Sequence, residues 1–123
     1  MAASAQYRDE EAQELWGEAG LASEQAGDME YASRCRTDQA ISFIHLKRYE
    51  LALVVSEKAI QLDRTYWRGW AERGVALDWL ERWDEAVDSC QKALDSNPPA
   101  KKVADIQSGL EFVMSRPRRS AGS

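Results

Sequence analysis

The sequence contains few residues that break helices and few that carry redox or metal chemistry. Seven glycines and three prolines among 123 residues leave long uninterrupted stretches, in which the common residues Ala, Glu, Leu, Gln, Arg and Lys favour helix over strand. The two cysteines, Cys35 and Cys90, fit no metal-ligand spacing. The single histidine, His45, is weak support for catalysis, because an active site needs several converging groups. We therefore predict an all-α, non-enzymatic protein that uses neither a metal nor a cofactor.

The sequence also lacks excess positive charge and long apolar runs. Its net charge of −5 opposes general binding to nucleic acid or to anionic lipid, which requires a cationic surface. No stretch approaches the roughly 20 apolar residues that cross a bilayer, and the first ten residues are neither basic nor apolar. We expect no nucleic-acid partner and no membrane partner, and a cytoplasmic location, with a nuclear one also open.

The central part of the sequence repeats itself after 34 residues. A shift of this length places small residues on small ones and bulky residues on bulky ones, as expected where paired helices pack closely. The aligned pairs are Arg34 with Arg68, Ala40 with Gly74, Phe43 with Leu77, Leu46 with Leu80, Arg48 with Arg82, Tyr49 with Trp83, Ala52 with Ala86, Lys58 with Lys92 and Ala59 with Ala93. Each repeat is therefore predicted to be two antiparallel helices that cannot bury their apolar faces alone.

These residues resemble the tetratricopeptide repeat family. The family pattern has an early aromatic, a small residue four positions later, an aromatic after the turn, alanines seven apart and a closing proline. The second repeat matches it with Trp70, Gly74, Trp83, Ala86, Ala93 and Pro98. The first repeat departs from it, because Arg36 replaces the early aromatic and Arg64 the closing proline. The resemblance implies an antiparallel helix-pair solenoid, with clear repeats at 33–66 and 67–99, that binds a protein partner in a concave groove.

The flanking segments complete a predicted domain over residues 9–115, with about six helices. One further helix is predicted from Glu10 to Ala26, and the next spans Met29 to Leu46. After Pro99, residues 100–115 are predicted to form a capping helix that covers the last apolar face. Its stripe contains Val103, Ile106, Leu110, Val113 and Met114. Residues 1–8 and the basic tail 116–123 are expected to be disordered.

The resemblance implies that the first helix of each repeat lines the groove. The candidate groove residues are Arg34, Asp38, Ile41, His45, Arg68, Glu72, Val75, Asp78 and Trp79. One branch of the family holds acidic chaperone tails with cations and asparagines in this groove. Carried onto this chain, an asparagine becomes Asp38, a lysine becomes Arg68 and an arginine becomes Glu72, so only Arg68 keeps the required charge.

We therefore predict an interaction scaffold or adaptor that binds a peptide or helix of a partner protein. Asp38, Glu72 and Asp78 favour a segment with apolar and cationic groups over an acidic tail. A co-chaperone with an altered carboxylate clamp is one alternative. A self-associating structural subunit, joined through the side of Trp67 or an uncovered end of the stack, is another. Trp67 and Trp79 lack a packing role in the repeat pattern and are candidate partner anchors. The sequence does not name the partner.

Overall fold

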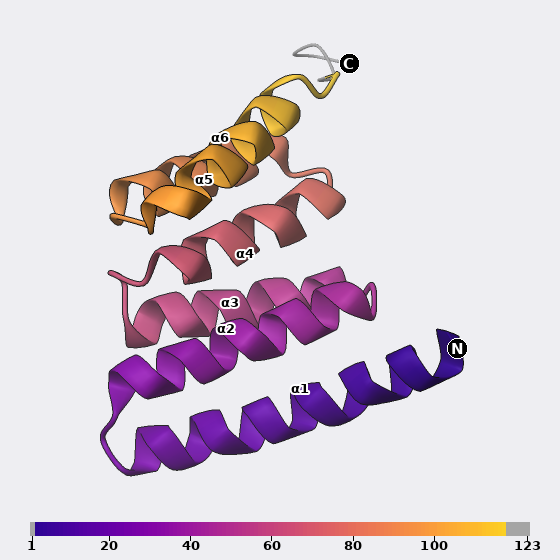
Figure 1. Ribbon diagram of the computed structural model, residues 1–123, viewed down its shortest axis with the longest axis vertical. Helices are drawn as coiled ribbons and strands as arrows, with labels where there is room; N and C mark the ends of the chain where they lie inside the picture. Colours follow the sequence, from indigo (N-terminus) through magenta and orange to yellow (C-terminus); the bar gives the residue numbers. More distant parts are fainter. Residues whose placement is uncertain (1, 118–123) are drawn as a thin grey trace.

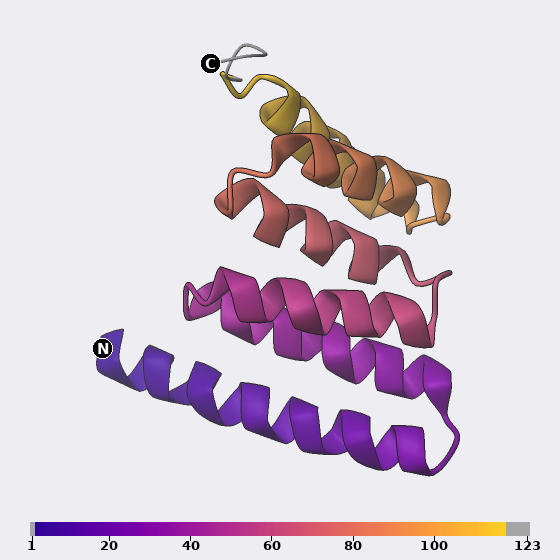
Figure 2. The same ribbon diagram turned by 180° about the vertical axis from the view of Figure 1, so that it is seen from behind.

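A computed structural model describes residues 2–117 as a stack of helices without strands, which confirms the predicted all-α solenoid. Each helix runs antiparallel to the next, and the N-terminal and C-terminal helices form opposite ends of the stack (Figures 1 and 2). The helices are α1 (Ala2–Gln25), α2 (Met29–His45), α3 (Tyr49–Leu62), α4 (Trp67–Trp79), α5 (Trp83–Asp95) and α6 (Ala100–Met114). Besides neighbours in sequence, α2 and α4 contact each other. The first helices of the two repeats therefore lie side by side.

The turns between helices repeat with the sequence. Lys47 and Glu81, which are 34 residues apart, both adopt positive φ, at 60° and 61°. In each turn the next backbone N–H returns to a carbonyl in the last helical turn, from Arg48 to Phe43 and from Arg82 to Leu77, at 2.9 Å. This left-handed residue with its returning hydrogen bond is a common way to end a helix. The repeat therefore extends to the backbone conformation.

Two apolar clusters join α2 to α6. The first contains Phe43, Ala52, Leu53, Ala76, Leu77, Ala86 and Val113. The second contains Ile60, Trp70, Ala93 and Ile106. Alanines at the closest helix contacts are fully buried, which lets neighbouring helices approach and share one core. Residues from α6 enter both clusters, so this helix covers the apolar side of the second repeat.

The N-terminal helix α1 packs differently, because neither cluster includes one of its residues. It contacts α2 through side-chain hydrogen bonds and ion pairs, including Gln13 to Gln39 and Glu24 to Arg36. It also begins at Ala2, whereas we predicted a start at Glu10 after a disordered segment. The pairing of Asp9 with His45 and of Glu10 with Arg48 holds its first half against the α2–α3 turn. These long-range pairs were not recognisable from the segment itself.

The C-terminal segment also departs in part from the prediction of a disordered tail. Arg116 donates two hydrogen bonds of 3.0 Å to the carboxylate of Asp78, and its guanidinium lies 4.3 Å from the centre of the Phe112 ring. The end of α6 is thereby tied to the end of α4. Residues 118–123 of the expected tail lie outside the described residues.

Candidate partner-binding groove

A pocket of about 210 Å³ opens between α4 and α6. Equivalent positions of the two helices meet in it, because Arg68 and Lys102, Glu72 and Ile106, and Val75 and Gly109 are each 34 residues apart. Helix α6 thus takes the place that the first helix of a third repeat would occupy. We call the surface formed by α2, α4 and α6 the first-helix face.

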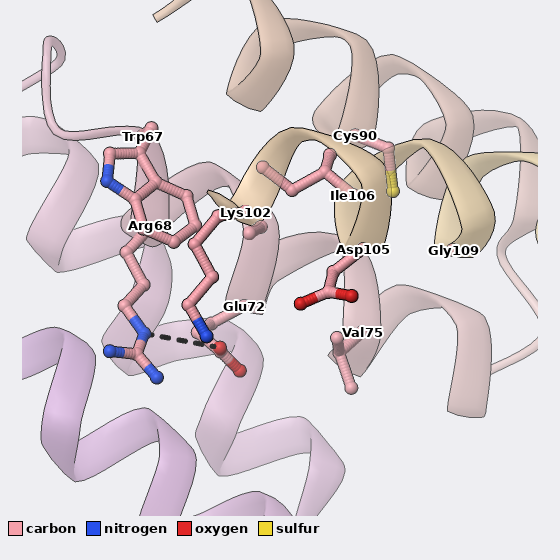
Figure 3. A pocket seen from close by; sticks show the side chains of 10 residues that line it. Trp67, Arg68, Glu72, Val75, Cys90, Lys102, Asp105, Ile106 and Gly109 are labelled. Carbon is pink, nitrogen blue, oxygen red and sulfur yellow. Dashed lines mark ion pairs between the residues drawn. The ribbon is translucent and has the colours of Figure 1, made fainter. Parts of the chain in front are cut away.

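The pocket combines an apolar lining with charges of both signs. Its lining residues are Trp67, Arg68, Ala71, Glu72, Val75, Cys90, Lys102, Asp105, Ile106 and Gly109. Figure 3 shows Trp67, Arg68 and Lys102 toward one end of the pocket and Val75 and Gly109 toward the other. A cavity with an apolar lining and a few polar groups at its rim can accept an apolar side chain and fix its orientation.

The charged groups of α2 and α4 gather around Tyr66. Arg34 lies over its ring at 5.5 Å, and burial raises the pKa of its hydroxyl. Burial also raises the pKa of Asp38 and of Glu72, while the charge of Arg68 opposes both shifts. Arg68 approaches Glu72 to 3.9 Å, the outer limit of an ion pair. The candidate charges Arg34, Asp38, Arg68 and Glu72 therefore act on one another across two repeats.

Three other candidate residues have partners inside the chain. The carboxylate of Asp78 is engaged by Arg116 and is only 14% exposed, so it supplies little free negative charge to the groove, contrary to our expectation. Trp79 stacks on Tyr49 with ring centres 5.1 Å apart, yet it remains 56% exposed. His45 Nδ1 lies 3.3 Å from Asp9 Oδ1. The remaining candidate, Ile41, is half-buried on α2.

Sequence reasoning missed the α6 side of the pocket. Lys102, Asp105, Ile106 and Gly109 were assigned to a cap rather than to a binding site. A signal was present, because the 34-residue shift that aligns Arg34 with Arg68 also aligns Arg68 with Lys102. Trp67, which was weighed as an anchor, does line the pocket.

The described residues hold no group of three or more His, Cys, Asp or Glu side chains arranged for a metal ion. Both thiols are buried, and burial raises the pKa of Cys35 and raises that of Cys90 to about 11. Thiolates are the reactive form of cysteine, so neither side chain is activated as a nucleophile. Among the described helices, none is long and apolar enough to cross a membrane.

Solved structures of tetratricopeptide domains have the same helix arrangement. The Arabidopsis OM64 TPR domain is 22% identical, with a TM-score of 0.58 over 85% of this chain and 98% of that one. The second TPR domain of human RPAP3, in complex with the HSP70 peptide SGPTIEEVD, is 21% identical, with a TM-score of 0.59 over 88% and 99%. The chain has the tetratricopeptide-repeat fold.

Further comparisons agree with this TPR fold. The first TPR of Spaghetti (RPAP3), bound to the HSP90 peptide SRMEEVD, is 19% identical, with a TM-score of 0.55 over 85% of this chain and 95% of that one. The Schizosaccharomyces pombe DnaJ homolog subfamily C member 7 homolog is 31% identical over 73% of this chain. The Arabidopsis thaliana Hsp70-Hsp90 organizing protein 2 is 26% identical over 58%. The matches span only 19% and 13% of those two proteins. No family model matches the chain.

Proposed function

We propose that this TPR chain is a non-enzymatic adaptor or scaffold that binds a linear segment of a partner protein on the first-helix face. The pocket between α4 and α6 is the observation that carries this proposal. Its volume of about 210 Å³ is below the roughly 300–1,000 Å³ typical of sites for small molecules and cofactors. A pocket of this size suits one anchoring side chain, with the charged rim providing specificity.

A dodecapeptide display library, selected on the intact chain, tests this proposal. The selection is repeated with an Asp38→Lys and Glu72→Lys double variant, because these acids lie around Tyr66 on the first-helix face. We expect peptides that are enriched by the wild-type chain and lost with the double variant. Circular dichroism of the variant provides the control for folding. Failure to enrich any peptide, or equal enrichment by both proteins, would contradict binding on this face.

A co-chaperone with an altered carboxylate clamp is the second candidate, because two of the solved TPR domains with this fold hold acidic chaperone peptides. The acids Asp38 and Glu72 oppose it, since like charges in a partly desolvated groove lower affinity. Calorimetry with the peptides SRMEEVD and SGPTIEEVD separates the two functions. We expect no binding at micromolar concentrations. Micromolar binding that Arg68→Ala abolishes would favour the co-chaperone.

Self-association is the third candidate, and it is motivated by the outer side of α1. Tyr7, Leu15 and Leu21 are each more than half exposed there. Three glutamates, Glu11, Glu14 and Glu18, are exposed on the same helix, and their repulsion opposes pairing of two copies through this side. Light scattering after size exclusion, over a concentration series, is expected to give a monomer mass throughout. A mass that rises with concentration would support the structural subunit.

A further inference from the structure

Equivalent residues of α2, α4 and α6 form rows across the first-helix face. The first turn contributes a row of cations, Arg34, Arg68 and Lys102, at intervals of 34 residues. About one turn later there is a row of acids, Asp38, Glu72 and Asp105. The next row is apolar in α2 and α4, with Ile41 and Val75, and α6 places Gly109 there. A partner that lies along the helices meets cations, then acids, then apolar groups.

All three rows are present in the pocket between α4 and α6. An α-helix rises 1.5 Å per residue, so the cation and acid rows are about 6 Å apart and the apolar row lies about 4.5 Å further on. Adjacent acidic, basic and apolar side chains of one partner segment can span these intervals, at i, i+4 and i+7 in a helix. The row pattern therefore matches the reach of a single short segment.

Two charges on the pocket rim lack an ion pair within the chain. Neither Lys102 nor Asp105 pairs with an opposite charge among the residues the structure describes. In α4 an acid follows the cation four residues later, but in α6 this position is Ile106, which leaves Lys102 without an acid on the next turn. Asp105 is exposed. Both charges are thus available to a partner, and they have opposite signs.

We propose, on the basis of the adaptor function above, that the pocket selects a partner segment by the order of its charges. An acidic side chain of the partner lies against Lys102 and Arg68, a basic side chain lies against Asp105, and an aliphatic side chain enters the pocket beside Val75 and Gly109. A segment with the acid and base exchanged would place like charges together at both ends of the rim. Such repulsion discriminates strongly between partners in a partly desolvated site.

Gly109 provides a direct way to close the pocket. A β-carbon built at this glycine meets no atom within 4 Å, so a side chain there enters open space rather than the core. Gly109→Leu is therefore expected to fill the apolar part of the pocket while the fold is kept. Gly109→Ala is the matched control, because it makes the same backbone change and adds one methyl group.

The experiment uses a peptide enriched in the display selection described above, and a synthetic version in which its acidic and basic residues are exchanged. Fluorescence anisotropy measures the binding of both peptides to the wild-type chain, to a Lys102→Glu and Asp105→Lys double variant, and to the two Gly109 variants. We expect enriched peptides in which a basic residue stands between an acidic and an aliphatic residue. Exchange of the charges should weaken binding at least about tenfold, and the double variant should reverse this preference. Gly109→Leu should weaken binding about tenfold or more, whereas Gly109→Ala should bind nearly as the wild type does.

The outcomes distinguish this proposal from the adaptor function. Enriched peptides without the acid, base and aliphatic order would overturn the proposal and leave the adaptor function in place. Binding that is unchanged by the double variant or by Gly109→Leu would do the same, because the peptide would then bind elsewhere on the first-helix face. A selection that enriches no peptide would overturn both.

Discussion

The two ends of the stack are held by different kinds of interaction. At the C-terminal end, α6 contributes Ile106 and Val113 to apolar clusters that reach back to α2 and α3. At the N-terminal end, α1 contacts its neighbours through a seam of polar groups. Gly17 faces the amide of Gln39, and Glu24 pairs with both Arg36 and Lys58. Length therefore does not indicate attachment, because α1 is the longest helix and yet adds nothing to either cluster.

This difference teaches how stability and orientation are divided in the molecule. Burial of apolar area supplies most of the free energy of folding, whereas part-exposed ion pairs contribute little each. The polar seam nevertheless fixes the register of α1, since each pair requires a specific partner. We expect α1 to open at a lower free energy than the helices of the apolar clusters.

Deletion of an end helix should give the largest difference between the two ends. A chain that ends at Pro99 loses α6 and exposes Trp70, Leu77 and Ala93, so we expect aggregation or loss of helicity. A chain that begins at Asp28 loses α1 and exposes mainly polar groups of α2. We expect it to stay folded. Circular dichroism and light scattering measure both outcomes, and equal behaviour of the two truncated chains would refute the comparison.

Overpacking of the apolar core should have the next largest effect. Ala86 is fully buried in the first cluster, so Ala86→Leu is expected to destabilise the fold by about 1–3 kcal/mol. Ala22→Leu, on the exposed side of α1, is the control and should change the free energy of unfolding by less than about 0.5 kcal/mol. Thermal unfolding compares them. An unchanged melting temperature for Ala86→Leu would mean that the repeat register is wrong.

Two glycine substitutions sharpen the same contrast. At Gly74 a new β-carbon would lie 3.0 Å from Cys90 Sγ, in the packed core, and we expect Gly74→Ala to destabilise by about 1 kcal/mol. At Gly17 it would meet the end of the Gln39 side chain at 2.7 Å, which can rotate away. The gain in helix propensity should then make Gly17→Ala neutral, or stabilising by up to about 1 kcal/mol. Urea unfolding of the two variants tests the order.

The smallest expected effect is a pH-dependent gain in stability at Glu72. Burial raises the pKa of Glu72 in the folded state, so its charged form destabilises the fold above that pKa. The penalty disappears as the pH falls below the unfolded value, because both states are then protonated. Glu72→Gln should raise the melting temperature at pH 7, by less than about 1 kcal/mol because the weak pair with Arg68 is lost, and should have no effect near pH 3. A loss of stability at pH 7 would show that the pair with Arg68 outweighs burial.

The candidate site could be predicted only in part. The 34-residue repeat placed Arg68, Glu72 and Val75 on the first helix of a repeat, and all three line the pocket. The opposite wall was missed, because α6 lacks the alanines and aromatics that mark the other repeats. Asp78 was misjudged for a related reason. Its partner, Arg116, lies 38 residues further along the chain, in a segment with no pattern of its own.

The sequence by itself determined the helices, their turns and the repeat. These depend on local preferences and on the spacing of small and bulky residues, which are present in the sequence whatever the chain does elsewhere. The tertiary structure alone decided which charges are used inside the chain and which remain available. Asp78, Asp105, Lys102 and Arg116 carry full charges in the sequence, but only packing brings Arg116 to Asp78 and leaves Lys102 and Asp105 at the pocket rim. An ion pair forms through distance in space, and sequence separation does not fix that distance.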